Sequence, residues 1–295
     1  MAPLTFAPHL GLTDPAAGMF VEHGGSLEGQ IRFAHAAGFR ALEDNFYKAR
    51  SPEDQQIITR TLRELDMRMG VFVATFSTAS PMHGRYGADQ PSFASSKSAH
   101  IDAILQELED SLTLARSAGA QWLTVLSGGE DPTRDRAYQT AQMVETLRLA
   151  APMAERAGVG LAIEPINRRD WPGTFLHTVA QGYQVVRAVD HPSIKLLFDV
   201  YHVQVETGRV LENLDATYDE IAYVQFADNP GRGAPGTGEL HAPAFFGALQ
   251  ARDYRGIIGI EHGHRFDGLR GEEDTLARYA ALERALRGEG SDARR

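Results

Sequence analysis

One local pattern recurs along the chain and constrains its fold more than any other feature: an amphipathic segment, then a glycine, then a short apolar run. The clearest copies are IRFAHAAGFRALEDNF (31–46), LTLARSAGAQWLTVLSG (112–128) and PMAERAGVGLAIEP (152–165). In each copy the glycine (Gly38, Gly119, Gly158) stands where a left-handed residue commonly ends a helix. Helices that alternate with short apolar strands predict parallel βαβ units.

The number of these units indicates the fold class. Eight apolar runs are predicted strands, at 4–9, 39–46, 69–76, 121–127, 159–164, 194–199, 220–226 and 256–262. Predicted helices lie between and after them, at 25–37, 52–66, 98–118, 134–157, 176–189, 202–214, 242–252 and 272–287. Pro152 is expected to kink or shorten the helix at 134–157.

Eight such units favour a closed (β/α)8 TIM barrel of the α/β class. We expect a single domain over residues 1–288, followed by a polar C-terminal tail at 289–295. An open dinucleotide-binding sheet has little support, because no GxGxxG turn follows the first strand. The long polar loop at 77–97 follows the third strand, on the face where barrel active sites lie.

Composition excludes several classes of protein. The chain has no cysteine, which rules out disulfides and thiolate chemistry. Its net charge of −10 argues against a nucleic-acid-binding surface. No apolar stretch approaches the ~18 residues of a membrane span, and the start lacks a secretory-signal pattern. We expect a cytoplasmic protein with neither a nucleic-acid nor a membrane partner; the oligomeric state stays open, a homo-oligomer included.

Polar residues stand at the ends of the last four predicted strands. Glu164, Asp199 and Glu261 end the fifth, sixth and eighth strands, and Gln225 lies near the end of the seventh. Because strands of a parallel barrel end at one mouth, these side chains can converge. Three clustered carboxylates repel one another unless a cation neutralises them, and oxygen ligands suit Mg²⁺ or Mn²⁺. Alternatively, a lone acidic residue can cap a helix, and an amide can satisfy backbone groups.

Three more polar residues are candidates for binding a substrate. His202 follows Asp199 by three residues and opens the next helix, and Asp170 lies in the loop after Glu164. Arg232 lies in the Gly/Pro-rich loop ADNPGRGAPGTGELH, which allows close approach to an anionic group. A capping histidine and a long turn are the alternatives. Further residues that could line the mouth stay unassigned: His9, Glu43, His177, His262 and His264.

Four motifs carry a resemblance to a known family: IEPIN, FDVYH, ADNPGRGAPGTGE and IGIEHG. Together they resemble the hydroxypyruvate isomerase family of the xylose-isomerase-like TIM barrels and, more distantly, the ketose 3-epimerases. The resemblance implies that the four strand-end residues bind the divalent cation and that Glu164 and Glu261 move a proton. By the same resemblance, His202, Asp170 and, allowing one inserted residue, Arg232 contact the substrate.

The implied activity is a metal-dependent isomerisation of a small hydroxy-carbonyl compound. Hydroxypyruvate, or a related 2-oxo acid, would pass through an enediolate to tartronate semialdehyde or its equivalent. Family members usually carry an aromatic residue directly after the last ligand, whereas this chain has His262, so the chemistry is better indicated than the substrate.

Several alternatives remain. A ketose 3-epimerase or sugar isomerase and an inosose-type dehydratase would use the same carboxylates. An abasic-site endonuclease-like barrel would need more histidine ligands and a basic face. A non-catalytic subunit would be expected to lose a ligand.

Overall fold

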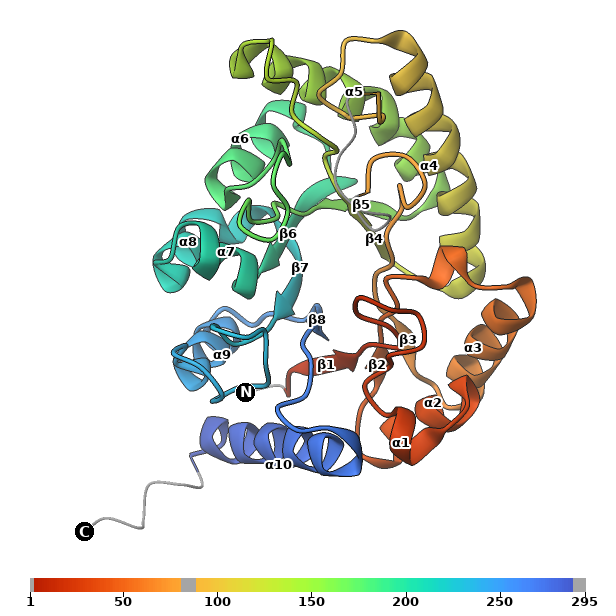
Figure 1. Cartoon of the computed structure of the whole chain (residues 1–295), viewed down its shortest axis with the longest axis vertical. Coiled ribbons are helices and arrows are strands. Elements are labelled where there is room, and N and C mark those ends of the chain that lie inside the picture. Colours follow the sequence, from red (N-terminus) through yellow and green to blue (C-terminus); the bar gives the residue numbers. More distant parts are fainter. Residues whose placement is uncertain (1–2, 81–88, 289–295) are drawn as a thin grey trace.

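In the part of the chain that the structure describes, eight short parallel strands surround the centre of the molecule, and the helices lie outside them (Figure 1). The computed structural model describes residues 3–80 and 89–288. The strands are β1 (Thr5–Pro8), β2 (Ala41–Leu42), β3 (Arg68–Met69), β4 (Trp122–Val125), β5 (Gly160–Ile163), β6 (Ile194–Asp199), β7 (Ile221–Phe226) and β8 (Ile257–Ile260). Each overlaps a predicted strand, so the single-domain TIM barrel is confirmed. The predicted tail at 289–295 and part of the 77–97 loop lie outside the described residues.

Six of the strands form one hydrogen-bonded sheet in the order β1-β8-β7-β6-β5-β4, and β2 pairs with β3. Isolated parallel bridges join the two groups, His9 with Glu43 beside β1 and Val73 with Thr124 in β4. β2 and β3 are shorter than the predicted strands because only a few backbone hydrogen bonds connect them to their neighbours. The strands nevertheless follow their sequence order around the barrel, so their carboxyl ends share one mouth.

Ten α-helices among the described residues cover the outside of the strands. They are α1 (Val21–Gly24), α2 (Leu27–Ala36), α3 (Pro52–Glu64), α4 (Ser98–Ala118), α5 (Arg136–Ala157), α6 (Val179–Val189), α7 (Val200–Glu206), α8 (Val210–Thr217), α9 (Ala242–Ala251) and α10 (Gly268–Leu286). Within the described ranges, the 3-10 helices η1 (Tyr47–Ala49) and η3 (Tyr218–Glu220) precede α3 and β7. None of these helices has the length and apolar character needed to cross a membrane.

Three predicted details of the helices can be compared with the structure. Gly119 and Gly158 end α4 and α5 in left-handed conformation, as predicted. Pro152 does not shorten its helix, because α5 continues past it to Ala157; a kink at this proline, the other expected effect, stays a prediction. The prediction of a single helix at 202–214 is wrong. Gly208 lies between α7 and α8 with a φ of 64°, a left-handed conformation that interrupts the helix.

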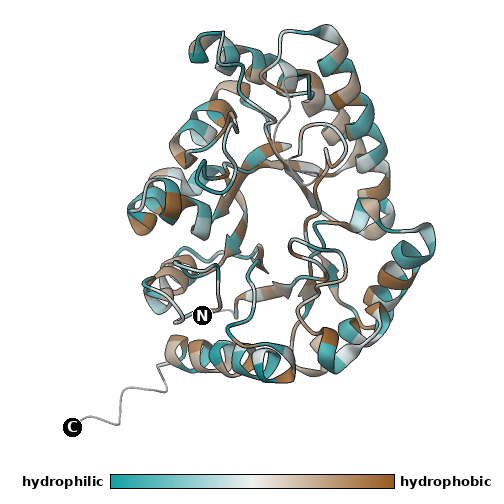
Figure 2. Ribbon diagram, viewed as in Figure 1, coloured by the Kyte–Doolittle hydropathy of each residue, from teal (hydrophilic) through white to brown (hydrophobic). Residues whose placement is uncertain are grey.

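Buried apolar side chains form three clusters among the described residues, and the two larger ones build the barrel. Most buried side chains pack between the strands and the helices, and the strands are mainly brown on the hydropathy scale (Figure 2). A second cluster fills the barrel with side chains contributed by most of the strands: Ala7, Ala41, Val71, Ala162, Leu197, Tyr223 and Ile257. This filling leaves the mouth at the strand carboxyl ends as the place for a site.

A buried ion pair anchors the chain after β2. Asp44 is fully buried, and its Oδ2 accepts from Nε of Arg50 at 2.5 Å. Arg50 also donates to the backbone carbonyls of Leu10 and Pro15, which belong to the loop after β1. The pair therefore ties the ends of the first two strands together on the mouth side.

We expect Arg50→Met to lower the free energy of unfolding by about 3–5 kcal/mol, because it leaves the Asp44 carboxylate buried without its partner. Urea unfolding monitored by circular dichroism measures this difference. Arg32→Met is the matched control, since Arg32 pairs with Glu28 and Glu64 on the exposed helical surface. Equal loss of stability in both variants would contradict a special role for the buried pair.

Candidate active site

The four predicted ligand positions lie at one level of the barrel. Glu164 and Glu261 directly follow β5 and β8, and Asp199 pairs in register with Gln225 across β6 and β7. The backbone N–H groups of Glu164 and Glu261 continue the sheet, because they donate to the carbonyl oxygens of Val125 and Phe226. All four side chains are buried. The barrel therefore brings together the four residues that the sequence places at strand ends.

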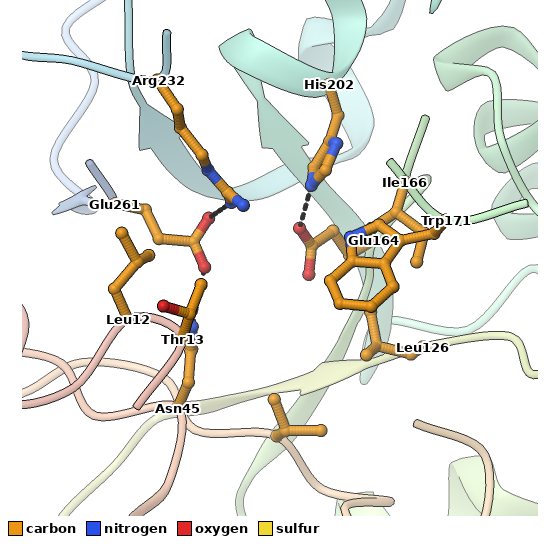
Figure 3. A pocket seen from close by; sticks show the side chains of 11 residues that line it. Leu12, Thr13, Asn45, Leu126, Glu164, Ile166, Trp171, His202, Arg232 and Glu261 are labelled. Atoms are coloured by element: carbon orange, nitrogen blue, oxygen red, sulfur yellow. Dashed lines mark hydrogen bonds and ion pairs between the residues drawn. The ribbon is translucent and has the colours of Figure 1, made fainter. Parts of the chain in front are cut away.

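A small pocket of about 80 Å³ opens beside these residues (Figure 3). It is lined by Leu12, Thr13, Asn45, Val73, Leu126, Glu164, Ile166, Trp171, His202, Arg232 and Glu261. In Figure 3, Glu261 and Arg232 lie on one side of the pocket and face Glu164 and His202 on the other. Four of the predicted site residues thus line one pocket.

The predicted substrate contact Asp170 has a different position. Its carboxylate is exposed and accepts from the side-chain amide of Asn167 at 3.0 Å. Asp170 is not among the side chains that line the pocket. It lies in the loop above Asn167, so the structure does not bring it into the pocket with the other candidates.

Burial shapes the electrostatics of this site. Burial raises the pKa of Glu164 well above its usual range, and the charges of Glu261 and Asp199 raise it further. Burial, again with the charge of Glu261, raises the pKa of Asp199 to about 7. Arg232 opposes both shifts. A cluster of carboxyl groups held this way becomes fully ionised only when positive charge lies close to it.

Arg232 supplies part of that positive charge. Its Nη2 lies 2.5 Å from Oε2 of Glu261 and 3.6 Å from Oδ2 of Asp199. The guanidinium also lies over the ring of Tyr201, 5.0 Å from its centroid. A guanidinium that is held between carboxylates and an aromatic face can present its remaining N–H groups to an anionic ligand.

The loop that carries Arg232 is shaped by a buried carboxylate. Asp228 follows β7 and is fully buried. It accepts hydrogen bonds from the backbone N–H groups of Asn229, Gly236, Gly238 and Leu240. A Cβ at Gly238 would lie 2.2 Å from the carbonyl oxygen of Asn229, so only glycine allows this close approach. The glycines of the loop therefore fold it around Asp228 and turn Arg232 toward the pocket.

His202 is buried with a defined proton arrangement. Its Nδ1 receives a hydrogen bond from the backbone N–H of Asn167 at 3.2 Å. A backbone N–H can only donate, so Nδ1 is the acceptor and the neutral ring carries its hydrogen on Nε2. Nε2 lies 3.4 Å from Asp199 and 3.7 Å from Glu164. Burial lowers the pKa of His202 well below its usual value, and Arg232 lowers it further, so the ring stays neutral.

A cluster that could hold a metal ion lies on one side of the pocket. One ligand atom from each of Glu164, Asp199 and His202 lies within 4.8 Å of the others. With its hydrogen on Nε2, His202 turns an N–H toward this point, so the carboxylate oxygens are the ligands that the arrangement offers. Oδ2 of Asp199 and Oε1 of Gln225 are buried and have no hydrogen-bond partner among the described residues. Such oxygens fit a hard divalent cation, which would satisfy them. Glu261 does not belong to this cluster, since its Oε2 is paired with Arg232.

The histidines that stayed unassigned lie behind the pocket or away from it. His9 is buried, and its Nε2 donates to the carbonyl oxygen of His262 at 3.1 Å. His262 stacks on Tyr279 of α10, and His264 contacts Thr275 of the same helix. Burial lowers the pKa of His9 to about 4 and that of His262 to about 3. These three rings connect the end of β8 to its surroundings.

Two other unassigned residues also have structural partners. His177 lies outside the pocket, 3.0 Å from the carboxylate of Glu206 in α7. Glu43 lies inside the barrel and accepts a hydrogen bond from the hydroxyl of Tyr223 at 2.9 Å. Burial raises the pKa of Glu43 well above its usual range, as does the charge of Glu261.

The pocket contains residues that the sequence patterns miss. Asn45 donates from Nδ2 to Oε1 of Glu261 at 2.7 Å. The run Glu43-Asp44-Asn45 is a signal for it, because three polar residues there interrupt an apolar strand. The opposite wall is apolar, formed by Val73, Leu126, Ile166 and Trp171. These side chains come from three different loops, and no local pattern marks them.

Comparison with known proteins identifies the family. Residues 31–283 match the family model described as xylose isomerase-like TIM barrel. The chain belongs to the xylose isomerase-like TIM barrel family. This family assignment confirms the superfamily expected from the strand-end motifs.

Named relatives agree with this family. A Homo sapiens protein provisionally named hydroxypyruvate isomerase is 31% identical over 278 residues, which cover 92% of this chain and 94% of that protein. The 2-oxo-tetronate isomerase of Cupriavidus necator is 33% identical over 237 residues, 79% of this chain and 86% of that protein. Both relatives carry isomerase names, which supports an isomerase activity for the chain.

Solved structures of the family share the fold. The structure titled AP endonuclease, family 2 from Brucella melitensis superposes with a TM-score of 0.76 at 22% identity, covering 95% of this chain and 98% of that one. An L-ribulose 3-epimerase superposes with a TM-score of 0.73 at 20% identity, covering 99% and 100%. At these identities the likeness concerns the barrel alone.

Proposed function

We propose that this chain is a divalent-metal-dependent isomerase that moves a proton between adjacent carbons of a small 2-oxo acid with a neighbouring hydroxyl group. Hydroxypyruvate, giving tartronate semialdehyde, and 2-oxo-tetronate are the substrates to test first. The observation that carries the proposal is the pair of buried carboxylates, Glu164 and Glu261, facing each other across one small pocket beside Arg232. The isomerase names of the relatives support it.

In this proposal the two carboxylates carry the proton. One removes a proton from the carbon that bears the hydroxyl, and a proton returns to the neighbouring carbonyl carbon from the other carboxylate or from the same one. The hydroxyl becomes the new carbonyl and the old carbonyl oxygen takes up its proton, so the atoms balance in an isomerisation. The apolar wall limits water beside the transient enediolate.

The remaining residues bind and orient. Glu164, Asp199 and Gln225 would hold Mg²⁺ or Mn²⁺, and Glu261 would join them as the fourth predicted ligand once its Oε2 is released from Arg232. When bound, the cation polarises the substrate carbonyl and makes the adjacent C–H more acidic. His202 offers its Nε2–H to a substrate oxygen, and Asp170 could reach a longer substrate from the edge of the loop.

A substrate panel in D₂O tests this function. The purified chain is incubated with Mn²⁺ or Mg²⁺ and hydroxypyruvate, 2-oxo-tetronate or a neutral ketose, and NMR follows both product and deuterium content. Isomerisation of an oxo acid with deuterium at the reacting carbon is the expected result. Conversion of ketoses alone, at the third carbon, would instead indicate an epimerase, and loss of water would indicate a dehydratase.

Arg232→Ala is expected to raise the KM for an anionic substrate by about 10- to 100-fold, because a charge-assisted hydrogen bond to the carboxylate is lost. The KM for a neutral ketose should change much less. Steady-state kinetics on both substrates measures the difference. Arg209→Ala, at an exposed arginine beside α8, is the control. An equal change in KM for the anionic and the neutral substrate would contradict carboxylate binding by Arg232.

A further inference from the structure

The two oxygens of Glu261 are held from different sides. Oε2 pairs with Nη2 of Arg232 at 2.5 Å, and Oε1 accepts from Nδ2 of Asn45 at 2.7 Å. Both donors line the pocket with Glu261, and Figure 3 shows Arg232 above and Asn45 below the carboxylate. Two donors at the two oxygens fix the plane of the carboxylate as well as its position.

The chain around Asn45 is itself held in place. Asn45 is only 6% exposed and follows two fully buried acidic residues. Glu43 connects the backbone to β1, because its N–H donates to Pro8 at 3.1 Å, and its side chain accepts from Tyr223. Asp44 is paired with Arg50. The three consecutive polar residues therefore have separate partners, and the first two hold the third in a fixed orientation.

We propose that Asn45 is a positioning residue that sets the orientation of the Glu261 carboxylate for proton transfer. The inference rests on the proposed function, since it assigns Asn45 a role in that reaction. Asn45 acts through geometry: its amide keeps Oε1 on the side of the pocket where the substrate carbon would lie. Without this donor the carboxylate can turn about its own axis, and a misplacement of about 1 Å is enough to cost about 10²-fold in rate.

Three substitutions separate positioning from packing. Asn45→Leu keeps the branched shape and the number of heavy atoms without a donor, and we expect kcat to fall about 10- to 100-fold with little change in KM. Asn45→Gln keeps the donor on a longer side chain and should retain more activity than the leucine variant. Asn45→Asp keeps the shape but places a second carboxylate beside Glu261, and it should be at least as impaired as leucine. Asn213→Leu, in α8, is the matched control and should retain the wild-type kcat.

Deuterium exchange gives a readout that a purely structural role would not change. In D₂O, deuterium in recovered substrate reports return of a proton to the carbon that lost it, and deuterium in product reports transfer of a proton to the neighbouring carbon. The ratio of the two measures how the enediolate divides between these fates. We expect Asn45→Leu to shift this ratio and Asn213→Leu to leave it unchanged. If Asn45→Leu keeps the wild-type kcat and ratio while the wild type isomerises its substrate, the positioning role is refuted and the proposed function stands.

A stability measurement tests the contact between Asn45 and Glu261 independently of catalysis. Asn45→Leu, Glu261→Met and the double variant form a cycle in urea unfolding. A coupling of about tenfold or more in the unfolding equilibrium constant is expected for a hydrogen bond to a carboxylate. Zero coupling would overturn the contact on which the inference depends. A wild type with no isomerisation of any compound, despite this coupling, would overturn the proposed function and with it the role of Asn45.

Discussion

Glu164→Gln is expected to lower kcat by about 10²–10⁴-fold, the range that a positioned acid or base usually contributes. The variant keeps the size of the side chain at the end of β5 but cannot accept and return a proton. Because burial already raises the pKa of the Glu164 carboxyl group well above its usual range, a neutral amide should be accommodated without unfolding. Steady-state kinetics with the substrate found in D₂O, together with the melting temperature, measures both effects.

Glu261→Gln is expected to lower kcat by a similar factor. In the double variant, the fall in kcat should be no larger than the product of the two single factors. Glu220→Gln is the matched control, because Glu220 is also buried but pairs with Lys195 and Arg187 before the start of β7. It should affect stability and leave kcat unchanged. Wild-type kcat in the double variant of Glu164 and Glu261 would refute their roles in proton transfer.

The parts of this structure that depend on local sequence are the predictable ones. Each strand is an apolar run close to a helix end, so all eight appear in the sequence as segments of the correct type. The four strand-end residues follow from them, because in a parallel barrel the register places all carboxyl ends at one mouth. For the same reason Glu164, Asp199, Gln225 and Glu261 could be grouped without any knowledge of contacts.

The parts that depend on contacts between distant segments could not be predicted. Asn45 and Glu261 are 216 positions apart, and nothing in either segment indicates the other. The same holds for His9 and the carbonyl of His262, 253 positions apart. The position of Asp170 depends on how its loop folds around Asn167, which the six-residue spacing from Glu164 does not determine.

Interruptions within elements were also hard to predict, for a related reason. Pro152 does not end α5, because one missing hydrogen bond costs less when a long helix packs on its neighbours. Conversely, Gly208 has a conformation that ends a helix, although the apolar pattern continues across it. Tertiary packing determines which of two such local signals prevails.

Removal of divalent cations is expected to lower kcat by about 10³-fold or more, since electrophilic stabilisation by a metal is worth several kcal/mol. The donor set supports this expectation: Oδ2 of Asp199 and Oε1 of Gln225 are buried with no hydrogen-bond partner among the described residues, and burial raises the pKa of Asp199 to about 7. Dialysis against EDTA followed by addition of Mn²⁺, Mg²⁺ or Ca²⁺ measures the loss and the recovery. We expect Mn²⁺ or Mg²⁺ to restore kcat.

Thermal unfolding provides a second readout of the same site, because an ion that binds only the folded chain raises its melting temperature. The wild type should gain stability with Mn²⁺, and Asp199→Asn should lose most of this gain since its carboxylate is central to the cluster. Asp215→Asn, at an exposed position in α8, should keep the full gain. Full kcat in excess chelator would refute a metal at this position. So would a rise in melting temperature with Mn²⁺ that is as large in Asp199→Asn as in the wild type. The carboxyl groups of Glu164, Asp199 and Glu261 would then have to be neutralised by Arg232 and by protons alone.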